Sequence, residues 1–186
     1  YEPMAVNSLN VSIGTSIEVK TFKSLNDIAD KIDMGQVARA PARFSINQLS
    51  RLNSDILTQL DIRVISERLK VDGILFDDGI WNVIKSNIKN ISEYKAWDKI
   101  IKGSIKVDNL DYSFMKLAES LLPPEPWGDG TWADWIGRIK KSSDKKGKDL
   151  FLPLRRAITG LSDGPELKNI ILLMGYDKIK DRLSGK

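Results

Sequence analysis

The sequence of 186 residues contains no cysteine and no histidine. This absence excludes disulfide frameworks, Cys/His zinc sites and nucleophiles of the Ser-His-Asp or Cys-His type. No apolar run approaches the roughly 20 residues that span a bilayer, and no pair of acids has a spacing typical of acid–base catalysis. Phosphate-loop and dinucleotide patterns are also absent. We therefore predict no catalytic residue and no metal site in this chain.

The composition is that of an ordinary globular protein from a reducing compartment, with 41% hydrophobic and 29% charged residues. The chain shows no signal-peptide pattern and begins at Tyr1, without an initiator methionine. We expect a cytoplasmic protein and a fragment of a longer chain. The length fits one domain or two small ones.

Apolar residues recur at helical spacing along most of the chain, and we predict an all-α array of about nine or ten short helices. Ser24 and Ser45 are expected to cap two of them. Pro165 is expected at the first position of another, which would end at Gly175. The only strand candidate is Val11–Thr21, which alternates briefly.

Positive charge is concentrated between Arg138 and Arg156, where eight cations face two acids. This segment has a net charge of +6, whereas the whole chain has +4, so the remainder is net negative. Such local charge is what a phosphate-binding surface requires. A solvated helix face and a flexible lysine-rich loop explain it equally well.

Two further features stay open on the residues alone. The turn from Thr159 to Leu167 precedes a helix and could present free N–H groups to an anion, although a simple cap is the more frequent role of such turns. Trp132 and Trp135 share a face with Ile136 and Ile139, so we predict that both lie in the core. Trp127, in a loop rich in proline and glycine, could stack on unpaired bases or pack locally.

Several segments resemble the bacterial glutamyl-tRNA synthetases, with an alphaproteobacterial character near the start. The stretch KGKDLFLPLRRAITG at Lys146–Gly160 is similar to the family's KGKELFMPLRLALTG. The family's HIGH and KLSKR-like catalytic signatures are absent, and Ser45 stands where the family usually has aspartate. Similar segments run in family order from residue 2 to 175: Glu2–Val6, Ile13–Ser16, Val37–Phe44, Leu49–Asn53, Gly164–Leu167 and Leu172–Gly175.

The resemblance implies the carboxy-terminal, tRNA-binding portion of an enzyme that ligates glutamate to tRNA with ATP and Mg. The catalytic part would lie outside this chain, so the chain alone should be inactive and bind no cofactor. Residues 1–39 would end the stem-contact region, 40–104 would form a first helical anticodon-binding subdomain, and 105–186 a second. The expected partner is glutamate tRNA, bound by a monomer.

The resemblance also implies site residues. Base contacts in the turn would come from backbone groups and Glu166, with Leu167 packed on a base. No arginine occurs between Lys85 and Asn90, the expected region for reading the third anticodon base, so charging of glutamine tRNA stays open. The implied anticodon-binding residues are Gly164, Pro165, Glu166, Leu167, Lys85 and Lys89, and the implied phosphate-binding residues are Lys146, Lys148, Arg155 and Arg156.

A second interpretation is a stand-alone helical adaptor that binds proteins or RNA and has no synthetase activity. The missing catalytic signatures distinguish the two interpretations only weakly.

Overall fold

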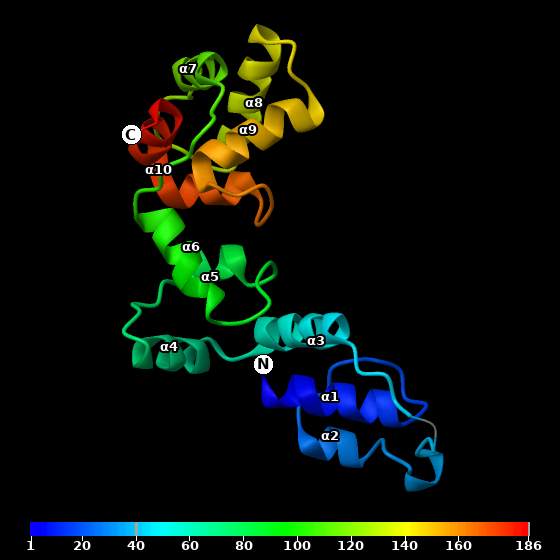
Figure 1. Ribbon diagram of the computed structural model, residues 1–186. Helices are drawn as coiled ribbons and strands as arrows, with labels where there is room; N and C mark the ends of the chain where they lie inside the picture. The colour runs from blue at the N-terminus through cyan, green and yellow to red at the C-terminus, as the bar shows by residue number, and fades with distance from the viewer. Residues whose placement is uncertain (40, 186) are drawn as a thin grey trace. The chain divides into compact units, whose positions relative to one another are not determined.

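The computed structural model describes residues 1–39 and 41–185, and within these ranges it is helical with no strand. The predicted all-α class is therefore confirmed. In chain order (Figure 1) the elements are α1 Pro3–Gly14, α2 Leu25–Ala29, the 3₁₀ turn η1 Met34–Gln36, α3 Ile46–Gln59, α4 Ile62–Val71, α5 Asp78–Ile84, α6 Glu93–Lys102, α7 Tyr112–Ser120, α8 Thr131–Ser142, α9 Gly147–Thr159 and α10 Leu167–Ser184.

The chain divides into two compact units. The first contains Tyr1–Asp77 and Lys85–Tyr94, and the second contains Asp78–Ile84 and the chain from Lys95 onward. The expected boundary at Ala40 lies outside the described residues. The expected boundary near Ser104 falls in the non-helical connection between α6 and α7.

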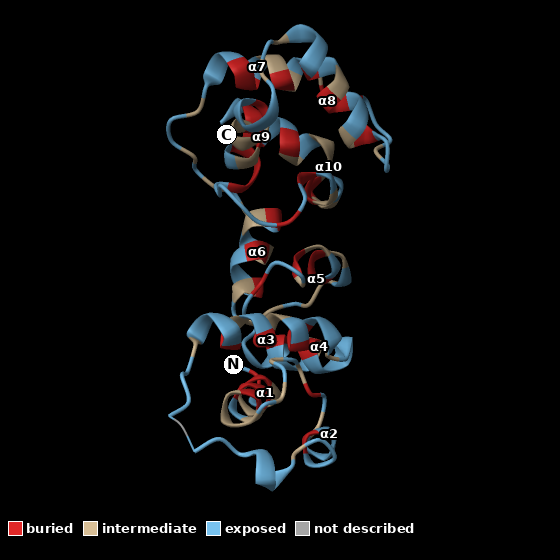
Figure 2. Ribbon diagram, turned by 90° about the vertical axis from the view of Figure 1, so that its right-hand side faces the viewer, coloured by how far each residue is buried: buried red, intermediate tan, exposed pale blue. Residues whose placement is uncertain are grey.

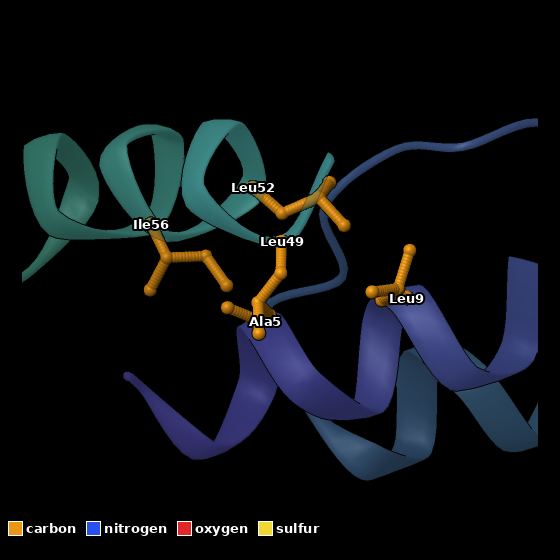
Figure 3. Packing of buried hydrophobic residues seen from close by; sticks show 5 residues of the cluster. All are labelled: Ala5, Leu9, Leu49, Leu52 and Ile56. Carbon is orange, nitrogen blue, oxygen red and sulfur yellow. The ribbon is translucent and has the colours of Figure 1, made fainter. Parts of the chain in front are cut away.

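The core of the first unit forms where α1 packs on α3. Its side chains recur at the i, i+3 and i+4 spacing of amphipathic helices. Figure 3 shows them pointing toward one another from the two helices: Ala5, Leu9, Leu49, Leu52 and Ile56.

A buried asparagine joins three segments of this unit. The side chain of Asn53 accepts from the Glu2 N–H and donates to the Lys89 carbonyl, each at 2.5 Å. The Glu2 carboxylate in turn accepts from Arg68 at 2.6 Å. Because buried polar groups need partners, this network fixes the start of α1 against α3 and the 85–94 segment.

The strand candidate at Val11–Thr21 does not form a strand, and its first residues belong to α1. Pro3 begins α1 at a position that suits proline, and Ser12, on its buried face, donates to the Ser8 carbonyl at 2.8 Å within the helix. The helix continues to Gly14, because a buried stripe over three turns outweighs a few alternating residues.

The caps predicted at Ser24 and Ser45 are confirmed. Ser24 and Asp27 form a reciprocal capping box, and Ser45 accepts from the Gln48 N–H at 3.4 Å. The serine that replaces the usual aspartate at 45 thus still starts its helix.

The second unit is built around α10, which packs against α5, α7, α8 and α9. Buried residues line the inward faces of these helices (Figure 2). Trp135, which is fully buried, donates from its indole N–H to the Ala118 carbonyl at 2.9 Å. Its predicted core position is confirmed.

Two cations of α10 close the carboxyl end of α6. Arg182, only 4% exposed, donates to the carbonyls of Ile100 and Gly103 at 2.7 and 3.0 Å. Lys178 donates to the Ile101 carbonyl at 3.1 Å and to that of Lys102. The last carbonyls of a helix have no partner within it, so these contacts bind α6 to α10. Burial lowers the pKa of both cations.

Asp111 caps α7 and also pairs with Lys145 in the loop before α9. Its carboxylate accepts from Ser113, from the Phe114 N–H and from Lys145, at 2.7, 3.1 and 3.1 Å. These contacts, the Ser113 hydrogen bond foremost, lower the pKa of Asp111 from 3.8 to about 2.

We predict that the contribution of Asp111 to stability is present above pH 4 and disappears as the pH falls toward 2. A carboxyl whose pKa is lowered by folding stabilises the native state only while it is ionised. Unfolding of wild type and Asp111→Asn should therefore differ above pH 4 and converge near pH 2. A carboxyl titration by NMR with its midpoint near 3.8 would contradict this assignment.

Candidate nucleic-acid interface

The loop from Gly160 to Glu166 connects α9 to α10 and begins with a left-handed residue. Gly160 has φ +74° and donates its N–H to the Arg156 carbonyl at 2.8 Å, which ends α9. The Thr159 hydroxyl donates to the Arg155 carbonyl at 2.8 Å and accepts from the Leu161 N–H at 3.1 Å. The entry to the loop is therefore fixed by local hydrogen bonds.

Arg155 holds the other end of this loop. Its Nη1 donates to the Pro165 carbonyl at 2.9 Å. Partial burial lowers the pKa of the guanidinium, and nearby Asp163 offsets that effect in part. Arginine keeps its charge under these conditions, so Arg155 acts as a brace between α9 and the loop. The predicted phosphate role of Arg155 stays a prediction.

Gly164 lies directly against the ring of Trp97. Its φ is +123°, and a Cβ built there would lie 2.8 Å from the Trp97 Cζ2 and Cη2 atoms. Trp97 is 6% exposed and cannot easily move aside. Only glycine satisfies both the backbone angle and the close approach.

α10 begins at Leu167, two residues later than predicted, so Pro165 is not at its first helical position. The Glu166 carbonyl accepts from the N–H groups of Asn169 and Ile170 at 3.1 and 3.3 Å, which makes Glu166 the N-cap. Pro165 is instead buried before the helix, with its carbonyl bound by Arg155. At Gly175, φ is +76° and the helix is interrupted, so the predicted end of the helix corresponds to this break.

The four turn residues predicted for anticodon binding divide into two pairs. Pro165 and Leu167 are buried, with Leu167 only 5% exposed. Gly164 and Glu166 are exposed. The Glu166 carboxylate makes an ion pair with Lys168 at 2.8 Å, and its hydrogen bond raises the pKa of that lysine. Of the four, Glu166 alone therefore presents a polar side chain to solvent.

Two pockets lie beside the turn, and they share Trp132 and Lys168. The first has a volume of about 300 Å³, and the second of about 270 Å³. Trp132, Phe151, Arg155, Glu166, Leu167 and Lys168 line the first; Gly128, Asp129, Trp132, Lys168, Asn169 and Leu172 line the second.

Trp132 is half-buried rather than part of the core as predicted. Its ring stacks on Phe151 with centroids 6.2 Å apart, and it meets Trp135 edge-on at 5.8 Å. Position 132 lies at the rim of the buried stripe of α8, so part of the indole lines the two pockets. Trp127 packs locally, with its indole N–H donating to the Pro123 carbonyl at 3.0 Å and its ring edge-on to Tyr176.

The basic segment divides into engaged and exposed cations. Arg138 pairs with Asp134 at 2.8 Å, and Lys145 pairs with Asp111 at 3.1 Å. Lys146, Lys148 and Arg156 are exposed. Cations at the amino end of a helix oppose its dipole, so Lys146 and Lys148 do not serve the stability of α9. A helix rise of 1.5 Å per residue places Lys148 about 12 Å along the axis from Arg156.

Lys85 and Lys89 lie in the first unit, whereas the turn belongs to the second. Lys85 is half-buried and Lys89 is exposed. The Lys89 N–H donates to Glu93 Oε1 at 2.9 Å, so its backbone is held in place. Their predicted contact with the anticodon stays a prediction.

Sequence reasoning missed four contributors to the site: Trp97, Trp132, Phe151 and Lys168. Lys168 directly follows the turn and could have been included for that reason. Trp97 and Phe151 meet the turn and the pocket only through folding, and although Phe151 lies in the Lys146–Gly160 stretch, its spacing does not indicate a contact with the pocket.

Comparisons with known proteins agree on one family. Residues 101–185 match the family model of an anticodon binding domain. The chain is 37% identical, over its whole length, to glutamate–tRNA ligase 1 of Parvibaculum lavamentivorans. It is 36% identical to glutamate–tRNA ligase 1 of Anaplasma marginale, in a match that covers 99% of this chain. It spans 41% and 42% of these relatives, respectively.

The fold is also that of solved structures of this kind. The chain superposes on a glutamate–tRNA synthetase from Elizabethkingia anophelis with a TM-score of 0.72 at 16% identity, covering 98% of this chain and 40% of that one. At this identity the likeness shows the fold alone. Among the described residues, no group of three or more acids could hold a metal ion, and no helix is long and apolar enough to cross a membrane.

We predict that Gly164→Ala lowers the free energy of unfolding by about 2 kcal/mol, because a positive φ costs a side chain roughly 1–3 kcal/mol and Trp97 must also shift. The matched control is Gly137→Ala in α8, where a Cβ meets nothing within 4 Å. That change should instead stabilise by about 0.5–1 kcal/mol. Denaturant unfolding measures both, and equal effects of the two substitutions would contradict the tight fit of Gly164.

Proposed function

Because the chain is homologous over its whole length to the carboxy-terminal part of glutamate–tRNA ligases, we propose that it is the tRNA-binding part of such an enzyme. We propose further that the turn residues Gly164 to Leu167 read anticodon bases. The observation that carries this proposal is the turn that Arg155 holds through the Pro165 carbonyl. It lies within residues 101–185, the range matched by the anticodon binding domain.

In the turn, the exposed groups would contact bases and the buried residues hold the turn in place. Backbone groups at Gly164 and the carboxylate of Glu166, which are exposed, would contact the edges of bases, which single-stranded RNA exposes; the Glu166 carboxylate keeps or exchanges its ion pair with Lys168. Pro165 and Leu167 anchor the turn in the second unit. Arg155 positions the turn through the Pro165 carbonyl.

Exposed cations would hold the RNA backbone. Lys146, Lys148 and Arg156 are the exposed members of the proposed phosphate-binding set, and contacts of this kind position a nucleic acid without reading its sequence. The charge of the segment, +6 within a chain of +4, matches this role.

The complete enzyme would activate glutamate with ATP and Mg and transfer it to the end of glutamate tRNA. Those steps belong to residues outside this chain. Within it, residues 1–39 would end the stem-contact region, with helical subdomains at 40–104 and 105–186. Lys85 and Lys89 would read the third anticodon base, and glutamine tRNA is a candidate second substrate.

We predict that Arg156→Ala weakens the binding of all tRNAs. It should also reduce the salt dependence of the affinity by the amount that corresponds to the loss of about one phosphate contact. The logarithm of the affinity should then change less steeply with the logarithm of salt, by roughly 0.7–0.9. Lys116→Ala, which removes an exposed cation of α7, is the control and should leave the slope unchanged. Fluorescence anisotropy across a salt series measures both. A wild-type affinity that is equal at low and high salt would contradict phosphate binding.

We predict that Glu166→Gln weakens the binding of glutamate tRNA about 10- to 100-fold and hardly affects the binding of a glutamate tRNA whose anticodon has been replaced. Loss of a charged acceptor costs about 1.5–3 kcal/mol where a base donates to it. Asp163→Asn, on the same exposed turn, serves as the matched control and should preserve the preference. An equal loss for both tRNAs would contradict base reading by Glu166.

A further inference from the structure

We propose that the exposed part of the Trp132 ring, with Lys168 beside it, is a binding site for an unpaired nucleotide. The base would stack on the indole, and its phosphate would contact the lysine ammonium. This inference rests on the proposed function and adds a binding element that lies outside the turn itself. Its ligand class is single-stranded RNA.

The two pockets beside Trp132 leave room for a ligand on its ring. Trp132 lines both pockets, so the exposed part of its ring stands between two hollows of about 300 and 270 Å³. These volumes are at or just below the low end of small-molecule sites, which run from about 300 to 1,000 Å³. Each therefore has room for a group of the size of a base.

The ring is held ready for stacking. Phe151 supports one side of it at 6.2 Å, and Trp135 holds an edge at 5.8 Å. Because the Trp132 ring is already packed, a base that stacks on its exposed part costs little side-chain conformational entropy. Stacking on an aromatic side chain contributes about 1–3 kcal/mol per base.

The charges around the ring fit a nucleotide rather than an apolar group. Lys168 lines both pockets and supplies a cation for phosphate. The Lys140 ammonium lies over the ring of Phe151, 5.9 Å from its centre, and Phe151 is the residue that stacks on Trp132. Glu166 in one pocket and Asp129 in the other offer acceptors to base amino groups. Cations and acceptors thus flank the aromatic surface.

The test compares Trp132→Leu and Trp132→Phe in the 186-residue chain, with a hairpin RNA that carries the anticodon loop of glutamate tRNA as the probe. Leucine keeps apolar volume and removes the stacking surface, whereas phenylalanine keeps a ring. We expect Trp132→Leu to weaken binding about 10- to 100-fold, Trp132→Phe to weaken it less, and the salt slope to stay unchanged in both. Tyr112→Leu, at an aromatic residue 66% exposed on α7, should bind as wild type does.

A second measurement keeps the proposal testable if Trp132→Leu unfolds. Single loop nucleotides of the hairpin are replaced by abasic sites, and binding to the wild-type chain is measured. At one or two positions the abasic hairpin should bind wild type about 10- to 100-fold more weakly. If no position matters, or if folded Trp132→Leu binds like wild type, the stacking site is overturned.

The two proposals fail in different ways. A wild-type chain that does not bind the hairpin or glutamate tRNA overturns the proposed function and this inference with it. A wild-type chain that binds with the expected anticodon preference, unaffected by Trp132→Leu, overturns the stacking site alone.

Discussion

The backbone of Gly164 rests on the Trp97 ring, and the geometry of the turn depends on that contact. A Cβ at 164 would lie 2.8 Å from two ring atoms, so the loop can approach α6 only where glycine stands. Arg155 then fixes the next residue through its carbonyl. Together these contacts leave Glu166 at the surface and bury Leu167, which is the arrangement that a preformed recognition turn requires.

The same unit separates charges that stabilise from charges that remain available. Lys145, Lys178 and Arg182 each hold a partner in the protein, and the last two close the end of α6. Since α6 also carries Trp97, the anchoring of α6 by α10 supports the platform under the turn. Lys146 and Lys148 lie at the amino end of α9, where their charges oppose the helix dipole. A ligand phosphate bound there would offset this unfavourable interaction.

The sequence predicted the helical class and both serine caps, because those depend on local spacing and on side chains a few residues apart. It placed the start of α10 at Pro165, since proline suits a first turn, but a tertiary contact from Arg155 holds that residue outside the helix. Trp132 was expected in the core because its helical stripe is apolar. How far a stripe is covered depends on neighbouring helices, and the sequence does not specify their placement.

The proposed RNA site comprises the turn and the Trp132 pockets. Hydrogen exchange followed by mass spectrometry, with and without the anticodon hairpin of glutamate tRNA, tests it most directly. We expect slower exchange in peptides that cover residues 128–132 and 160–169, and unchanged exchange in α1. Protection confined to other segments, with none at the turn, would contradict it.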